Sequence, residues 1–528
     1  MPTSRPTHGY RGTVAAAIAL TALVAAAPAD AATCESVALL VLPDTTIKSA
    51  ATVASGAYTP PGATAPVDVP AFCRVTGVVK PAVRFEVWLP MDGWNGKFHV
   101  SGNGGMAGVI SYGGLANALN RGYAAASTDT GHVRPGTGGF DASWALGRPD
   151  LVTDFGHRAL HVTTEAGKAI TRGYYERPPD HSYYTGCSKG GQQGLMAAQR
   201  YPDDFDGIIA GNPAHDWTRF YAGAHLWYAL ATLRDPESYI PRAKLPLLAA
   251  AVNDRCDALD GLEDGVLDDP RDCDFDPAAL TCRERQDPSS CFTPKQVQAV
   301  RTIWAGSRNA AGDVIYPGLV PGGENGPGGG WGSWVTGTEP FTSLHWLAAD
   351  GFFKYMVFEE PDWNFRTFDY DTDLEFALGK VGPSLDAADP DLRELRVGGA
   401  KLIVYHGWSD PDISPLASID YYEDVLSVIG GDRGRDVALT ETRDFFRLFM
   451  VPGMGHCSGG PGYNSLDALP ALESWVEDGI PPDTILGSRI EDGEVVRTRP
   501  LCAYPQTAGW DGTGNPDDAS SFACRNER

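Results

Sequence analysis

Positive charge is scarce in this sequence. Its 528 residues include 42 lysines and arginines against 67 aspartates and glutamates, which gives a formal net charge of −25. A surface with this excess of negative charge repels the phosphate backbones of DNA and RNA. We therefore expect no nucleic-acid partner. The hydrophobic content of 43% and charged content of 21% are typical of a soluble globular protein.

Long apolar runs are also scarce. The one candidate is residues 13–27, which are rich in alanine, leucine and valine and follow Arg5 and Arg11. A run of about 15 residues is too short to cross a bilayer, which needs roughly 20. A basic start, a short apolar segment and small residues at 29–31 are instead typical of a secretory signal. We predict a signal peptide over residues 1–31, secretion to the periplasm or the medium, and no membrane partner.

The sequence contains no Cys-x-x-Cys pair, which argues against a zinc site built from cysteines. All ten cysteines follow the predicted signal peptide, and an even number in an exported protein indicates disulfides. The spacing of the cysteines suggests two local disulfides and two disulfides near the chain ends. It suggests no partner for Cys187 or Cys457. The four suggested pairs are Cys34–Cys73, Cys256–Cys273, Cys282–Cys291 and Cys502–Cys524.

Residues 186–191 read Gly-Cys-Ser-Lys-Gly-Gly. The segment before them, 182–185, predicts a strand and the segment after them, 192–198, predicts a helix. A strand, Gly-x-Ser-x-Gly and a helix form the nucleophile elbow of α/β-hydrolases, although the letters alone also fit an ordinary loop. The first N–H groups of the helix would face the serine oxygen, where negative charge develops in acyl transfer. This pattern predicts Ser188 as nucleophile and the backbone N–H of Lys189 in an oxyanion hole.

Strand and helix patterns alternate around this elbow, which predicts an α/β fold with a mostly parallel sheet. The expected strands are 83–90, 97–100, 122–128, 207–211, 401–407 and 445–451, and the expected helices include 150–176 and 466–476. Residues 32–75, rich in proline, alanine and threonine, are expected to be loosely structured. The glycine-rich stretch 101–108 follows an early strand, where α/β-hydrolases place the other half of the oxyanion hole. Gly104 and Gly105 are therefore candidates, and a flexible hairpin loop is the alternative.

Residues 217–390 interrupt the alternation, because they are rich in aromatic residues, glycine and proline. We predict that they form a lid domain inserted into one α/β-hydrolase domain, which residues 32–216 and 391–528 build. Most tryptophans and phenylalanines between 331 and 363 are expected to form the core of the lid. One or two of them facing the active site would suit an aromatic substrate.

A serine nucleophile needs a base, and the base needs a carboxylate that orients it. In α/β-hydrolases the chain order is serine, acid, histidine, with the last two in loops beyond strand ends. Asp410 follows the strand 401–407, and Asp412 is the alternative two residues later. His456 follows the strand 445–451 and is the one histidine after the acid. We predict Asp410 and His456 in these roles.

A cysteine adjoins each proposed partner: Cys187 precedes Ser188, and Cys457 follows His456. If Ser188 and His456 are in hydrogen-bond contact, the two cysteines are close enough for a disulfide. Such a bridge would hold the serine loop against the histidine loop.

Taken together, the motifs resemble the tannase and feruloyl esterase family of the α/β-hydrolase superfamily, which also contains the enzyme that hydrolyses mono(hydroxyethyl) terephthalate. The resemblance lies in Gly-Cys-Ser-x-Gly-Gly at 186–191, His-Gly-x-x-Asp at 406–410 and Gly-His-Cys at 455–457, and it covers essentially the whole mature chain. It implies a Ser188–Asp410–His456 triad with a Cys187–Cys457 disulfide beside it. It also implies small aromatic ester substrates, feruloyl or galloyl esters attached to plant polysaccharide or polyphenol.

Residues 256–266 place several carboxylates in a turn-rich loop whose oxygen atoms would suit Ca²⁺. The spacing is not that of an EF-hand, and an acidic surface turn is the alternative. The resemblance implies a structural calcium site in the lid, far from the chemistry. Its ligands would be the carboxylates of Asp257, Asp260 and Asp264 and the carbonyl oxygens of Leu262 and Val266.

These inferences predict a secreted serine esterase that acts on esters of aromatic carboxylic acids through an acyl-enzyme. Two alternatives remain. One is an acyltransferase that uses the same triad. The other is a non-catalytic, calcium-dependent binding protein on the same scaffold, which an intact triad disfavours.

Overall fold

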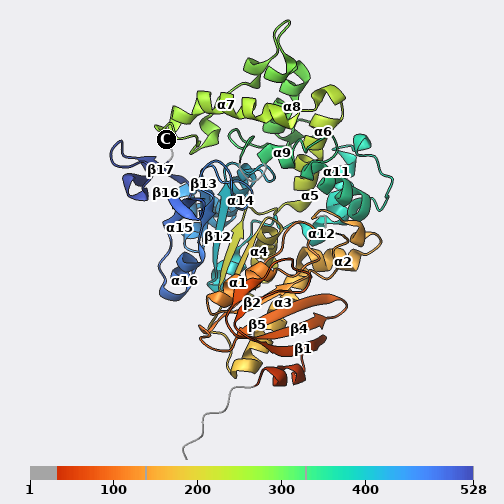
Figure 1. Ribbon diagram of the computed structural model, residues 1–528, viewed down its shortest axis with the longest axis vertical. Helices are drawn as coiled ribbons and strands as arrows, with labels where there is room; N and C mark the ends of the chain where they lie inside the picture. The colour runs from red at the N-terminus through yellow and green to blue at the C-terminus, as the bar shows by residue number, and fades with distance from the viewer. Residues whose placement is uncertain (1–32, 137–138, 327–329, 527–528) are drawn as a thin grey trace, which may run out of the picture.

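The computed structural model describes residues 33–136, 139–326 and 330–526. The predicted signal peptide lies outside the described residues. Nine strands form one sheet in the order β1-β4-β5-β7-β6-β8-β9-β12-β13 (Figure 1). The strands are β1 (Thr45–Val53), β4 (Phe72–Val79), β5 (Val83–Pro90), β6 (Lys97–Ser101), β7 (Ala124–Thr128), β8 (His181–Cys187), β9 (Gly207–Gly211), β12 (Lys401–Gly407) and β13 (Phe446–Val451).

From β7 to β13 all neighbours in the sheet run parallel, whereas β1, β4 and β5 run antiparallel to theirs. The predicted mostly parallel sheet is therefore confirmed. Strands β7 and β9 are buried at every position. Strands that are covered on both faces consist of continuous runs of small and apolar residues instead of an alternating pattern. Such runs can be recognised in the sequence, so these strands could be predicted.

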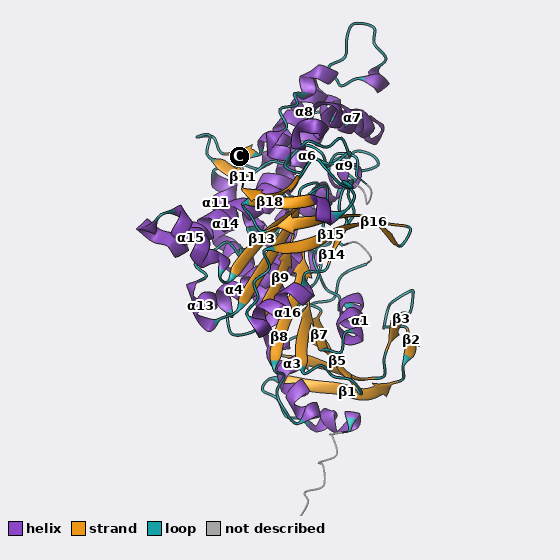
Figure 2. Ribbon diagram, turned by 90° about the vertical axis from the view of Figure 1, so that its left-hand side faces the viewer, coloured by secondary structure: helices purple, strands orange, loops and turns teal. Residues whose placement is uncertain are grey.

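Helices cover both faces of the sheet (Figure 2). On one face lie α3 (Ala159–Tyr175), α4 (Lys189–Arg200) and α14 (Pro415–Gly430), whose apolar side chains share one core with the strands. On the other face lie α1 (Tyr112–Asn120) and α16 (Leu469–Asp478), in a second core. The sheet is thus the middle layer of three, and the carboxyl ends of its parallel strands are left for loops that can carry function.

Between β9 and β12 the chain forms mostly helices, which lie above the carboxyl ends of the parallel strands at the top and right of Figure 1. These helices have a core of their own, in which Trp331, Phe352 and Phe353 are almost fully buried. The limits of a separate lid domain at 217 and 390 stay a prediction. The helices are α5 (Trp217–Phe220), α6 (Trp227–Leu233), α7 (Leu245–Cys256), α8 (Pro294–Ala305), α9 (Gly330–Trp334), α10 (Leu344–Gly351), α11 (Thr372–Lys380) and α12 (Gly382–Leu385). The next helix, α13 (Arg393–Gly398), packs against α4 and belongs to the core of the sheet.

The expectation that residues 32–75 are loosely structured is wrong. They contain β1, the hairpin of β2 (Gly56–Tyr58) and β3 (Val67–Val69), and the start of β4. The physical reason is that β1 is an edge strand whose alternating exposure is interrupted by a register shift between Ile47 and Ser49. Its sequence therefore carries no continuous period of two. Pairing with β4 and the Cys34–Cys73 disulfide hold it in place instead.

Directly before and after α16 the chain forms strands that the sequence pattern did not predict. They build a three-stranded sheet and a hairpin near the C-terminus. These strands are β14 (Ser465–Leu466), β15 (Thr484–Glu491), β16 (Glu494–Cys502), β17 (Gln506–Trp510) and β18 (Phe522–Asn526), and the other short elements are α2 (Pro149–Thr153), β10 (Ser307–Arg308), β11 (Val314–Tyr316) and α15 (Arg435–Arg443).

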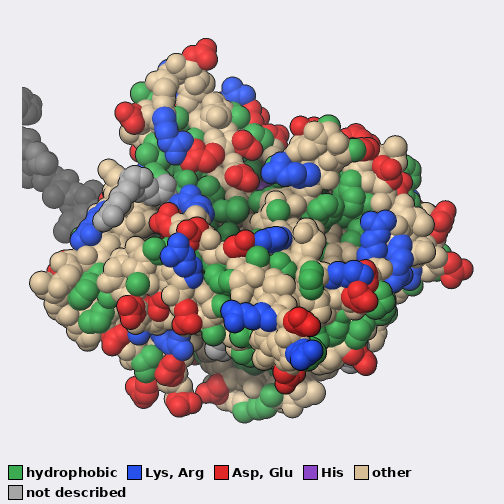
Figure 3. Space-filling view, turned by 90° about the horizontal axis from the view of Figure 1, so that it is seen from above, with side chains coloured by type: hydrophobic (Ala, Val, Ile, Leu, Met, Phe, Trp, Pro, Cys, Tyr) green, Lys and Arg blue, Asp and Glu red, His purple; other side chains and the backbone are tan. Residues whose placement is uncertain are grey.

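The surface seen from above the lid carries interspersed acidic and basic side chains (Figure 3). Within the described ranges, no helix has the length and apolar character that a bilayer crossing requires.

Candidate active site

Ser188 stands at a sharp turn between β8 and α4. Its backbone has φ 63° and ψ −119°, a conformation that a residue with a side chain adopts only where the surroundings enforce it. The N–H of Ser188 donates to the carbonyl oxygen of Gly211 on the neighbouring strand, at 2.9 Å. Gly191 must lack a side chain, because a Cβ there would overlap that same carbonyl oxygen. The predicted strand, turn and helix are thus present, and the turn is held by its neighbours.

A disulfide joins the serine turn to the histidine loop. Cys187 and Cys457 are bonded, with their Cα atoms 5.9 Å apart and 270 residues between them in sequence. Cys457 also has a positive φ of 64°. The other four bonds of the structure are the four pairs that spacing suggested, and no described cysteine is free.

His456 and Asp410 are in direct contact. The imidazole Nδ1 lies 3.0 Å from Oδ2 and 3.2 Å from Oδ1 of the carboxylate. The Asp410 carboxylate is buried and also accepts the side-chain amide of Asn212 at 2.7 Å and the backbone N–H groups of Asp412 and Ile413 at 2.8 and 3.2 Å. A carboxylate with this many donors is fixed in orientation, and so is the imidazole that contacts it.

Asp412, the alternative acid, faces the other imidazole nitrogen. Its Oδ2 lies 3.5 Å from Nε2 of His456. Among the described residues, no hydrogen bond joins the Ser188 hydroxyl to His456. Hydrogen bonds of a catalytic serine are often long before substrate binds. The structure therefore places Asp410 on the orienting side of His456 and Asp412 on the side that would meet the nucleophile.

Burial and neighbouring charges shift the pKa values of His456, Asp410 and Asp412. Burial lowers the pKa of His456, but Asp410 and Asp412 raise it more, to about 9. Burial raises the pKa of Asp410, but His456 and His406 lower it far more, well below the usual range of a carboxyl group. Burial raises the pKa of Asp412 to about 7. Asp410 is thus the carboxylate that remains ionised beside the imidazole.

The predicted oxyanion loop packs against the start of α4. A Cβ on Gly190 would approach the carbonyl oxygen of Asn103 to 3.0 Å, and the Asn103 N–H donates to the side chain of Gln193 at 3.0 Å. In the part of the chain that the structure describes, the backbone N–H groups of Gly104, Gly105 and Lys189 donate to no protein acceptor. They are therefore available to a ligand, as an oxyanion hole requires.

The side chain of Lys189 points into the protein interior, toward Phe155 and the lid residue Trp217, instead of the solvent. It is buried, with its ammonium nitrogen 4.2 Å from the centre of the Phe155 ring and 5.4 Å from that of Trp217. It also bonds to the side chain of Gln192. Burial lowers the pKa of Lys189 well below its usual range.

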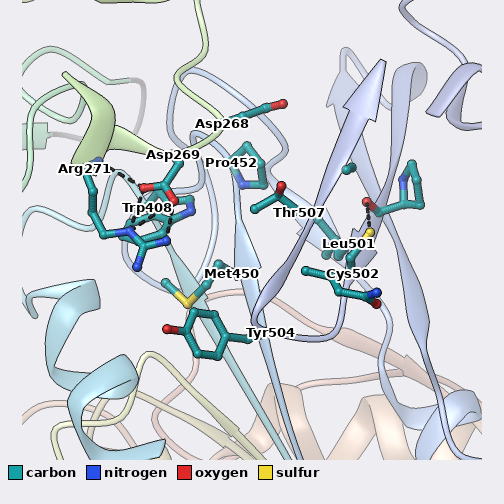
Figure 4. A pocket seen from close by; sticks show the side chains of 13 residues that line it. Asp268, Asp269, Arg271, Trp408, Met450, Pro452, Leu501, Cys502, Tyr504 and Thr507 are labelled. Atoms are coloured by element: carbon teal, nitrogen blue, oxygen red, sulfur yellow. Dashed lines mark hydrogen bonds and ion pairs between the residues drawn. The ribbon is translucent and has the colours of Figure 1, made fainter. Parts of the chain in front are cut away.

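A cavity of about 280 Å³ opens beside His456. Its lining includes Trp334, Leu344 and Pro411. The Trp334 ring stands edge-on to the His456 imidazole, with 5.0 Å between the ring centres. Of the aromatic residues between 331 and 363, Trp334 thus reaches the site, while others form the lid core. A second hollow, around Trp408 (Figure 4), has only about 30 Å³ and is too small for an aromatic acid.

The chain is similar to known proteins in both sequence and structure. The sequence model of the family described as tannase and feruloyl esterase matches residues 67–525. The chain belongs to this family. It is 41% identical to an uncharacterized esterase of Xanthomonas campestris, over 98% of this chain and 95% of that protein. It is 31% identical to feruloyl esterase C of Talaromyces stipitatus, over 92% of both chains. The crystal structure of feruloyl esterase B from Aspergillus oryzae superposes with a TM-score of 0.83 at 27% identity, covering 93% of this chain and 100% of that chain.

Membership in the tannase and feruloyl esterase family confirms the resemblance, the α/β-hydrolase fold and the prediction of a carboxylic ester hydrolase. The catalytic and oxyanion residues stay predictions, which the geometry above supports but does not test.

The predicted calcium loop of this esterase lies between α7 and α8, bonded to strand β16 (Figure 1). The carboxylates of Asp257 and Asp264 both accept the backbone N–H of Val266, at 3.2 and 3.1 Å. Within the described ranges, the carbonyl oxygens of Leu262 and Val266 accept no hydrogen bond. This set of free carbonyls beside carboxylates fits Ca²⁺. However, the carboxylates of Asp257, Asp260 and Asp264 do not all lie within 4.8 Å of one another, so binding would require them to move closer together.

Two residues of this site were not selected from the sequence. Asn212, which holds Asp410, follows the end of β9, and a polar residue directly beyond a buried parallel strand is the signal that could have found it. His225 belongs to the lid and contacts Asp412 at 2.9 Å. No sequence signal points to it, because only the folded lid brings it to the loop after β12.

Proposed function

We propose that this chain is an exported serine esterase that hydrolyses esters of aromatic carboxylic acids through an acyl-enzyme. The observation that carries the proposal is the Cys187–Cys457 disulfide. It joins the residue before Ser188 to the residue after His456, while Asp410 holds the imidazole from the far side. A nucleophile, a base and an orienting acid are thereby assembled from three segments of the chain, in the order that α/β-hydrolases use.

Side chains and backbone groups of this chain account for each step of the proposed ester hydrolysis. In its neutral form, His456 accepts the proton of Ser188 at Nε2 as the serine oxygen attacks the ester carbonyl. The backbone N–H groups of Lys189 and of Gly104 and Gly105 bind the oxygen on which negative charge develops. The imidazolium returns its proton to the leaving alcohol, and an acyl-serine remains. Water, deprotonated by His456, then releases the acid.

The aromatic substrate class rests on two supports. Curated relatives of this chain are named feruloyl esterases. The cavity next to His456 is lined by Trp334 and Leu344, and apolar and aromatic walls favour an aromatic ring. The natural source of such esters would be phenolic acids linked to plant polysaccharide or polyphenol.

The substrate class can be tested with methyl ferulate, methyl gallate, mono(hydroxyethyl) terephthalate and, as an aliphatic control, methyl butyrate. We expect at least one aromatic ester to exceed methyl butyrate in kcat/KM by about tenfold or more, since burying an aromatic ring contributes more than about 1.4 kcal/mol. Equal values for all four esters would contradict an aromatic acyl pocket. Added alcohol acceptors distinguish hydrolysis from acyl transfer, because a transferase would yield new esters in place of the free acid.

Export is proposed on the predicted signal peptide together with the disulfides. Five bonds within one chain are characteristic of oxidising compartments and are rare in the cytosol.

Calcium is proposed as a structural ion in the lid, held by Asp257, Asp260 and Asp264 with the carbonyls of Leu262 and Val266. When bound, it would neutralise their charge and stabilise the loop. We expect removal of the ion with EGTA to lower Tm by about 5 °C, because an ion that binds only the folded chain stabilises it by mass action. Differential scanning fluorimetry measures this shift.

The matched variants are Asp260→Asn, which removes a proposed ligand, and Glu263→Gln, which changes an exposed carboxylate of the same loop. Added Ca²⁺ should raise the Tm of wild type and Glu263→Gln but not of Asp260→Asn. An equal response of all three proteins would contradict the site.

A further inference from the structure

A second group of potential ligands lies directly behind the candidate active site. His225 comes from the lid segment between α5 and α6, His345 from α10, and Asp412 from the loop between β12 and α14. One ligand atom from each residue lies within 4.8 Å of the others, and all three side chains are buried. The Asp412 Oδ1 is 2.9 Å from His225 Nε2 and 3.8 Å from His345 Nδ1.

The hydrogen bonding of this cluster leaves one nitrogen aimed into it without a partner. His345 Nε2 lies 3.0 Å from the carbonyl oxygen of Pro411, so it carries the ring proton and donates it. Nδ1 of His345 is then a lone pair, and among the described residues it is buried with no hydrogen-bond partner. It faces the Asp412 oxygen, itself an acceptor, and two acceptors attract each other only through a proton or a cation.

We propose that His225, His345 and Asp412 form a binding site for a divalent transition-metal ion of the zinc type. Two neutral imidazole nitrogens and one carboxylate oxygen are the ligand set that zinc takes at sites with an open position. The bond from His345 to the Pro411 carbonyl is the outer contact that ligating histidines usually make, and it fixes which nitrogen faces the ion. The ring proton of His225 moves from Nε2 to Nδ1 when Nε2 becomes a ligand.

A metal ion bound at this site inhibits the proposed esterase activity. Asp412 Oδ2 lies 3.5 Å from His456 Nε2, so an ion on Asp412 has the proposed base beside its open position. A His456 nitrogen bonded to the ion cannot accept a proton from Ser188. Pro411 and His456, which contact the cluster, also line the cavity of about 280 Å³. This consequence, unlike the binding itself, rests on the function proposed above.

Binding is tested on the full mature chain, free of a polyhistidine tag and supplied with Ca²⁺, by titration calorimetry with ZnCl₂ and by metal analysis after gel filtration. We expect about one equivalent of zinc, and an affinity at least about 100-fold weaker in His345→Gln. The control is His99→Gln, because His99 is an equally buried histidine, on β6, bonded to Thr185; its affinity should match wild type. Equal zinc affinity in wild type and His345→Gln would overturn the site.

Two further measurements use the wild-type protein, so they test the site even if the His345→Gln variant does not fold. Wild type with Co²⁺ should show the visible absorption bands of a four- or five-coordinate nitrogen and oxygen site, and their absence would overturn the proposal. Zinc should lower kcat/KM of wild type by at least about 10²-fold, reversibly on adding a zinc-selective chelator, because a general base contributes about that much. Zinc that binds at the cluster without inhibiting hydrolysis would leave the site standing and overturn the inference that the bound ion reaches His456.

Discussion

Replacing Ser188 with alanine is expected to lower kcat by at least about 10³-fold without changing the thermal stability of the protein. The change removes one oxygen, and with it the atom that would form the acyl-enzyme. No described hydrogen bond of the fold depends on that hydroxyl, and alanine relieves none of the backbone strain of the turn, whose φ is 63°. The measurements are kcat on the best aromatic ester of the panel and Tm by circular dichroism.

The matched control is Ser182→Ala, the same substitution at the other end of β8. Ser182 is buried, as Tyr183 beside it is, but lies at the amino end of the strand, away from the lid. Its kcat should stay within about a factor of two of wild type. Wild-type turnover by the Ser188→Ala enzyme would contradict the serine mechanism.

The second large effect is expected from the disulfide beside the site. The double variant Cys187→Ala/Cys457→Ala should lose on the order of 10²-fold in kcat, because a displacement of about 1 Å between reacting groups has that effect. It should also lose stability. The bond closes 270 residues, for which the chain-entropy estimate is about 5 to 6 kcal/mol. Activity and denaturant unfolding are measured on the same preparations.

The control removes a different disulfide of the same protein. Cys34→Ala/Cys73→Ala opens a bond over 39 residues between the N-terminal segment and β4, for which the same estimate is about 4 kcal/mol. Its stability should fall while kcat below the unfolding transition stays near wild type. If both double variants keep their kcat, the Cys187–Cys457 bond stabilises the fold and has no part in positioning Ser188 against His456.

The parts of the fold that could be predicted are those in which local sequence and burial agree. Strands such as β9 and β12 are buried on both faces, so their apolar runs are visible in the chain. Ser188, Asp410 and His456 each follow such a strand. Position beyond a strand end, together with the two adjacent cysteines, therefore located them without a structure.

The parts that could not be predicted depend on contacts between distant segments. Strand β1 is defined by its ladder with β4 and not by its own pattern. Asn212 and His225 gain their roles only because the sheet and the lid place them next to Asp410 and Asp412, 198 and 187 residues away in sequence. Asp410 lies on the Nδ1 side of His456, where chain position predicts the orienting acid, but no sequence signal indicates that both carboxylates contact the same imidazole.

The most direct test of the serine mechanism is to trap its covalent intermediate. Wild-type enzyme mixed with p-nitrophenyl ferulate and quenched with acid within milliseconds should release a burst of about one equivalent of nitrophenol. Its intact mass should increase by one feruloyl group, which peptide mapping should locate on Ser188. The Ser188→Ala variant should show neither burst nor mass increase. Turnover without any acylated intermediate, or a feruloyl group on a different residue, would contradict the proposal that Ser188 is the nucleophile.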